Sequence, residues 1–83
     1  MNFTIKERWL LAQPGTTTDP GIEWVDLRSI ERVKYMPKTA NAGAQVTVYV
    51  SGNEVIVKSG YSSDETAIGD ASGLAEAVAA AKE

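Results

Sequence analysis

The chain has 83 residues and a net charge of −3, and it contains neither cysteine nor histidine. The length allows one domain over residues 1–83 and excludes a second independent core. Without cysteine and histidine there are no disulfides, no thiolate-bound or histidine-bound metals and none of the commonest enzymatic nucleophiles and general bases. We therefore expect a protein that is not an enzyme and has no metal site and no cofactor.

Charge and hydropathy set the expected partners and location. A slightly acidic domain differs from the basic surfaces of nucleic-acid-binding proteins. The longest apolar run near the start, Trp9–Ala12, is far shorter than the roughly 20 residues of a membrane span, and the sequence lacks the order of a secretory signal. We expect a cytoplasmic protein that binds neither nucleic acid nor membrane. Because so small a core supplies little stability, we also expect a homo-oligomer.

The first half of the chain is predicted to be extended, with turns between the strands. Alternation around Phe3 and Ile5, followed by the run Trp9–Ala12, predicts one strand with an irregular middle. Two turn signals, PG and DPG, predict a loop over residues 13–21. From Ile22 to Met36 we expect a strand end, one helical turn begun by a capping aspartate, and a second strand. Residues 37–44 are small and polar and are predicted to form another loop.

A β-hairpin over residues 45–59 is the strongest local prediction. A two-residue turn formed by the Gly-Asn pair at residues 52–53 suits the positive φ angles of a primed turn. This register sets Val48 opposite Val57 and assigns five valines to one face of the hairpin. These core-face residues are Val46, Val48, Val50, Val55 and Val57.

The C-terminal part is predicted to be a loop followed by a helix. Residues 61–72 are polar and acidic, and Gly69 and Gly73 disfavour a long helix there. Residues 73–83 are rich in alanine and predict a short helix with Leu74 and Val78 on its apolar face. The predicted fold class is therefore α+β: a small antiparallel β-sheet of three to five strands with one short C-terminal helix.

The basic residues that cluster near the middle of the chain are a candidate ligand site. Guanidinium groups hold phosphates and aromatic rings stack on bases, so this cluster with a neighbouring tyrosine suits a small anionic nucleotide. The alternative is a solvated strand face whose charge is balanced by nearby acidic residues, and the spacing does not separate the two interpretations. The candidate residues are Arg28, Arg32, Lys34, Tyr35 and Lys38.

Four large side chains are candidates for an interface. Trp9 and Trp24 are either core anchors or aromatic hot spots of a subunit contact. The predicted hairpin register sets Tyr49 opposite Ile56 on the face away from the valines. We expect a helix, a second subunit or another partner to cover that face.

The segments VDLRSIERV and VTVYVSGNEVIVKS, followed by a short helix, resemble small bacterial and phage β-meander proteins of the FlbD-like flagellar type. The similarity covers roughly residues 25–58 and implies a hairpin-containing sheet that ends in a helix. It assigns no functional residue. The style of the whole chain also resembles small phage accessory proteins, many of which inactivate host factors or sequester signalling molecules.

These patterns favour a non-catalytic binding protein, a phage or bacterial accessory factor that binds and modulates a host protein through a β-sheet surface. The first alternative is a sponge that sequesters a small anionic signalling nucleotide at the basic and aromatic cluster. The second is a structural subunit of a larger assembly. Self-association, partner capture and nucleotide binding distinguish the three hypotheses.

Overall fold

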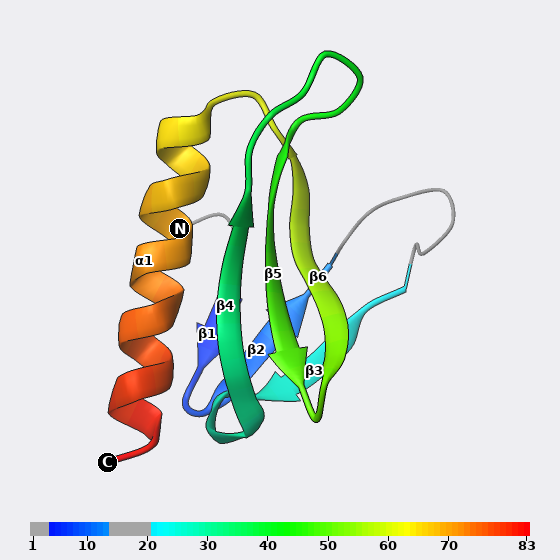
Figure 1. The fold of residues 1–83 in the computed structure, drawn as a ribbon. Helices are drawn as coiled ribbons and strands as arrows, with labels where there is room; N and C mark the ends of the chain where they lie inside the picture. The colour runs from blue at the N-terminus through cyan, green and yellow to red at the C-terminus, as the bar shows by residue number, and fades with distance from the viewer. Residues whose placement is uncertain (1–3, 14–20) are drawn as a thin grey trace.

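A computed structural model describes residues 4–13 and 21–83, and it places two small antiparallel sheets beside one C-terminal helix (Figure 1). The predicted α+β class is confirmed. The strands, however, form two three-stranded sheets rather than one sheet. Phe3 and most of the predicted loop over residues 13–21 lie outside the described residues.

The first sheet has the order β1-β2-β3, with β1 at Thr4–Lys6, β2 at Trp9–Ala12 and β3 at Glu23–Asp26. The predicted irregular middle of one N-terminal strand is in fact the turn of a hairpin, because Glu7 has a φ of 57° and reverses the chain between β1 and β2. Leu10, which pairs with Val25, is fully buried on the inner face.

A single 3₁₀ turn, η1 at Leu27–Ser29, joins the first sheet to the second, as predicted. Asp26 caps this turn, because its carboxylate accepts a hydrogen bond from the backbone N–H of Arg28 at 3.0 Å. The backbone N–H of Leu27 donates to the carbonyl of Arg8 at 2.8 Å. This bond fixes the turn after β3 against the turn between β1 and β2.

The second sheet has the order β4-β5-β6, with β4 at Ile30–Met36, β5 at Ala44–Val50 and β6 at Asn53–Tyr61. The loop before β5 agrees with the prediction to within one residue. The predicted hairpin register is wrong. The turn is formed by Ser51 and Gly52, whose φ angles are 53° and 79°, so Val48 pairs with Val55 instead of Val57.

The physical reason for the corrected register lies beside the turn. With Ser51 and Gly52 in the turn, the Tyr49 hydroxyl donates to the paired Glu54 at 2.8 Å, and the Gly52 N–H donates to Glu31 at 3.0 Å. Farther from the turn, two bulges take up the extra residues of the longer strand β6, so that Tyr61 at its end pairs with Ala44 at the start of β5. Between the turn and the first bulge, a shift of two residues keeps the side chains on their predicted faces, because side chains alternate with a period of two. Beyond that bulge the predicted facing changes, and Lys58 pairs with Val46.

The helix α1 spans Asp64–Ala81, so the predicted acidic loop over residues 61–72 is wrong and the helix begins nine residues before its predicted start. Ser63 caps it by accepting a hydrogen bond from the Thr66 N–H, and Asp64 and Glu65 lie in its first turn. Docking on the second sheet buries side chains along the whole length of the helix. This burial outweighs the roughly 1 kcal/mol that each of its glycines costs.

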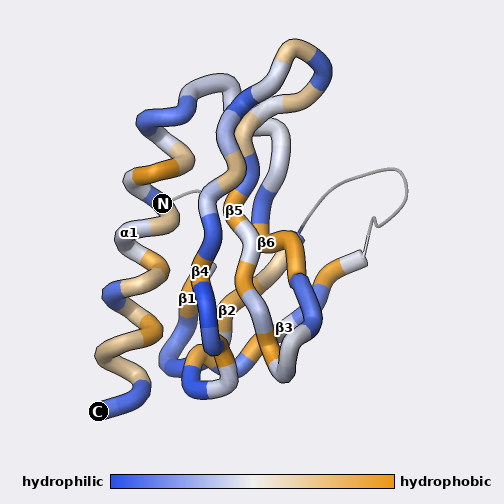
Figure 2. The backbone as a smooth tube through the Cα atoms, in the orientation of Figure 1, coloured by the Kyte–Doolittle hydropathy of each residue, from blue (hydrophilic) through white to orange (hydrophobic). Residues whose placement is uncertain are grey.

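The core lies between the helix, the inner face of the second sheet and the inner face of the first sheet, which crosses behind it (Figure 1). Hydrophobic residues recur along β5 and α1 between hydrophilic ones (Figure 2). Val46 and Val48 of β5 are fully buried, as predicted, and their β4 partners Tyr35 and Val33 pack against the same core. The backbone N–H of Gln13 donates to Val57 at 3.1 Å and links the end of β2 to β6.

Candidate functional site

The structure does not bring the five predicted ligand-binding residues together. Arg32 and Lys34 pair with Tyr49 and Thr47 on the outer face of the second sheet, whereas Tyr35 lies on the inner face against the helix. The other two residues, Arg28 in η1 and Lys38 after β4, flank opposite ends of this strand. Arg32, Tyr35 and Lys38 line three different pockets, so this set does not form one pocket.

On the outer face of the second sheet, Arg32 and Tyr49 already contact each other. The Arg32 guanidinium lies 4.5 Å from the centre of the Tyr49 ring, and the Tyr49 hydroxyl donates to Glu54 at 2.8 Å. This hydrogen bond, with desolvation, raises the pKa of Tyr49. Tyr49 and Ile56 are half-buried by such neighbours. The helix α1 does not cover this face, because it packs on the opposite, inner face. Covering by a second subunit or another partner stays a prediction.

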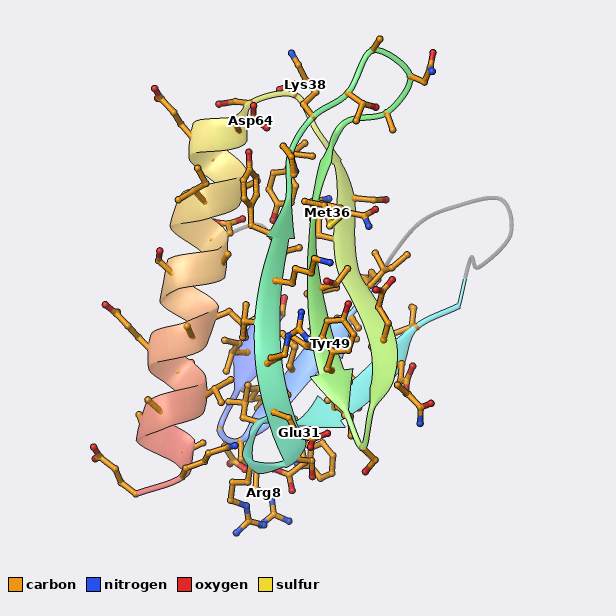
Figure 3. All side chains as sticks on the ribbon, in the orientation of Figure 1. Arg8, Glu31, Met36, Lys38, Tyr49 and Asp64 are labelled. Carbon is orange, nitrogen blue, oxygen red and sulfur yellow. The ribbon has the colours of Figure 1, made fainter. Side chains whose placement is uncertain are left out.

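Lys38 has a structural role at the start of the helix. Its backbone N–H donates to the Asp64 carboxylate at 2.9 Å, and its ammonium lies 3.5 Å from the Ser62 carbonyl (Figure 3). The pKa of Asp64 is lowered by the backbone hydrogen bond from Lys38 and by the hydroxyl of Tyr35. These contacts tie the end of β4 to the first turn of α1.

The outer face of the first sheet is the surface on which both tryptophans of the chain lie. In the strand register, Trp24 pairs with Leu11, and Trp9 pairs with Asp26 and Lys6. Trp9 is 39% exposed and Trp24 is 56% exposed, so neither is a core anchor. We call this surface the tryptophan face and define it by the outward residues of the three strands: Thr4, Lys6, Trp9, Leu11, Trp24 and Asp26.

Charged groups at one end of the tryptophan face neutralise one another. Asp26 lies 3.8 Å from the guanidinium of Arg8 and 3.5 Å from that of Arg28. The backbone N–H of Arg28, its side chain and the charge of Arg8 together lower the pKa of Asp26. The Arg8 guanidinium also lies 5.5 Å from the centre of the Trp9 ring. The arginines thus order this end of the face and supply only a small excess of positive charge.

A pocket of about 340 Å³ lies between the two indole rings, and Lys6, Glu7, Trp9 and Trp24 line it. This volume is at the lower end of the range for ligand pockets. Sequence reasoning did not identify Lys6 and Glu7, because it placed them inside one strand. The structural feature that reveals Lys6 and Glu7 as lining residues is the turn at Glu7, which has a positive φ. This turn places Lys6 of β1 opposite Trp9 of β2.

Comparisons with protein-family models, with curated proteins and with solved structures give no match. The resemblance to FlbD-like proteins therefore stays a prediction. Within residues 4–13 and 21–83, no group of acidic side chains is arranged to hold a metal ion. The one helix of this part of the chain is too polar to cross a membrane.

Proposed function

We propose that this chain is a non-catalytic binding protein that contacts a protein partner through the tryptophan face. The observation that supports the proposal most directly is the exposure of Trp9 and Trp24, 39% and 56%, on one face of a three-stranded sheet. Large exposed aromatic side chains that gather on one surface are typical of interaction sites, and tryptophan is enriched among the residues that dominate binding energy.

The alternative surface, the outer face of the second sheet, is less suited to binding. Its aromatic residue Tyr49 is half-buried, stacked by Arg32 and hydrogen-bonded to Glu54. A partner at that face would have to break these contacts before it made its own. On the tryptophan face, the Trp24 ring is 56% exposed, and the Trp9 ring has the Arg8 guanidinium 5.5 Å from its centre, so a partner there would displace fewer contacts among the described residues. We infer the role of a phage or bacterial accessory factor that acts on a host protein through this face.

Affinity capture with matched variants tests the proposal. The immobilised chain is exposed to bacterial lysate as the wild type, as Trp24→Ser and as Ile68→Ser, a control that removes a large side chain 48% exposed on α1. We expect the wild type and Ile68→Ser to capture the same protein. We expect Trp24→Ser to lose most of it, because truncation of a tryptophan hot spot costs about 2 kcal/mol or more of binding free energy.

Equal capture by the wild type and Trp24→Ser would overturn the proposal. If only Ile68→Ser loses capture, the binding surface is the exposed side of α1 and not the tryptophan face. Far-UV circular dichroism of the three proteins verifies that each variant is folded before its capture is compared.

A further inference from the structure

The size of the tryptophan face limits what it can hold. Its strands are three, four and four residues long, so the face extends roughly 13 Å along the strands and about 10 Å across them. A stable protein dimer buries about 800 Å² on each partner, which is several times the area of such a face. A short peptide segment fits it far better than a second copy of this chain.

The charge around the pocket points to an uncharged ligand. The pocket lining contains one positive side chain, Lys6, and one negative side chain, Glu7. The neighbouring guanidinium groups of Arg8 and Arg28 share the Asp26 carboxylate. A phosphate ligand would meet Glu7 at close range, and a cationic ligand would meet Lys6. The lining itself favours neither sign of charge, and the neighbouring arginines exceed the Asp26 carboxylate by a single positive charge.

The polar groups of the two indole rings point to a ligand that accepts hydrogen bonds. An indole N–H is a donor and has no acceptor capacity. Among the described residues, neither Trp9 nor Trp24 has a hydrogen-bonded partner for this group. Both exposed rings therefore line the pocket with apolar surface, and each also carries one N–H donor. The complementary ligand has apolar rings and exposed carbonyl oxygens.

We propose that the tryptophan face binds a short proline-rich segment in the polyproline II conformation. Such a segment is uncharged, its pyrrolidine rings pack against aromatic side chains, and its backbone carbonyls are free to accept hydrogen bonds. Proline has no N–H, so no donor of the ligand is left unsatisfied on binding. The conformation is already ordered before binding, so a small contact area suffices. This inference rests on the proposed function and names the chemistry of its partner.

Tryptophan fluorescence measures this binding directly, because both tryptophans of the chain line the pocket. The probe is an acetylated, amidated decaproline peptide, and the control is a glycine-serine peptide of equal length. We expect decaproline to shift the tryptophan emission to shorter wavelength in a saturable way. We expect the glycine-serine peptide to leave the emission unchanged.

Two substitutions of Trp24 separate packing from hydrogen bonding. Trp24→Ala removes the ring and is expected to weaken decaproline binding more than about tenfold. Trp24→Phe keeps an aromatic ring without the N–H and is expected to weaken it roughly threefold to tenfold. Met36→Ala removes a side chain that is 37% exposed on the second sheet and is expected to leave the affinity unchanged. Circular dichroism confirms that the variants are folded.

The proposal is overturned if decaproline at millimolar concentration leaves the emission unchanged, or if Trp24→Ala binds it as the wild type does. It is also overturned if the emission shifts with protein concentration alone, which would identify a second copy as the occupant. If an anionic nucleotide shifts the emission and decaproline does not, the ligand of this face is the nucleotide and the proposal is wrong. If decaproline fails while lysate capture still depends on Trp24, only the proline-rich identity falls and the proposed function stands.

Discussion

Tyr61 and Asp70 form a polar contact inside the packing of α1 on the second sheet. The Tyr61 hydroxyl donates to the Asp70 carboxylate at 2.7 Å, and the two residues are 5% and 8% exposed. Burying a carboxylate is unfavourable unless hydrogen bonds replace its water. Asp70 occupies a position that an apolar residue would fill in a simple amphipathic helix, so the hydrogen bond from Tyr61 on β6 stabilises the docked helix.

Tyr61→Phe is expected to lower the free energy of unfolding by about 1–3 kcal/mol, because it removes a donor from a buried carboxylate. Urea denaturation followed by circular dichroism measures the change. Tyr49→Phe is the control, since it also removes a tyrosine hydroxyl bonded to a carboxylate, but at the exposed side of the sheet. Its effect on stability is expected to be much smaller. Equal effects of the two substitutions would contradict the role given to Tyr61.

Asp64 makes the stability of the helix–sheet contact dependent on pH. Its pKa in the folded protein is lowered below 3.8 by the Lys38 N–H and the Tyr35 hydroxyl. A lowered pKa contributes stability that is fully present above pH 3.8 and is lost as the pH falls through the pKa of the folded state. Asp26 acts in the same direction. We expect the wild type to lose stability on acidification below about pH 4.

Asp64→Asn keeps an oxygen acceptor but removes the titrating group. The dependence of the unfolding free energy on pH between about 4 and 2 is therefore expected to be shallower in this variant than in the wild type. Urea denaturation at a series of pH values measures both slopes. Identical slopes would show that Asp64 does not contribute to the acid sensitivity.

At the scale of elements, the sequence predicted which segments are strands, turns or helix better than it predicted their boundaries and register. The hairpin and its faces followed from alternation, but its register depended on contacts of Glu31 and Glu54 that the local pattern does not contain. The helix was predicted too short because glycine propensity was weighed without the docking surface. Ala67 at its N-terminal end is fully buried against the sheet, and that gain is visible only once the sheet is in place.

Alanine substitution of two glycines, Gly69 and Gly43, separates the effect of helix propensity from the effect of close packing. A Cβ atom at Gly69 would meet nothing within 4 Å, so Gly69→Ala is expected to stabilise the protein by about 0.5–1 kcal/mol through helix propensity. A Cβ atom at Gly43 would lie 2.7 Å from the Tyr61 carbonyl and 2.9 Å from the backbone of Gly60. Gly43→Ala is therefore expected to destabilise it by about 1–3 kcal/mol.

Thermal and urea denaturation of the two alanine variants measures these opposite effects. The two variants are matched because each replaces a glycine by an alanine, so they differ only in the surroundings of the added methyl group. Destabilisation by Gly69→Ala would show that α1 is packed more closely at this position than the structure indicates.

At the scale of the whole molecule, the sequence named candidate site residues but could not place them in space. Trp9 and Trp24 were open to either a core or an interface interpretation, because the pattern does not show that β1, β2 and β3 form a separate sheet on which both rings stay exposed. The basic cluster failed as a single site because side chains alternate along β4. Which face of a small sheet stays open depends on the packing of both sheets and the helix, and local patterns do not contain it.

Radical footprinting of the chain in cells tests the central claim, that the tryptophan face is the binding surface. Met36, with an exposure of 37%, is the internal control for Trp9, with an exposure of 39%, because both side chains are readily oxidised and lie on different sheets. The chain is expressed at a low level in bacteria, and its oxidation is compared with that of the dilute purified protein. We expect oxidation of Trp9 and Trp24 to fall in cells relative to Met36. Unchanged tryptophan oxidation, or protection of Met36 instead, would contradict the account.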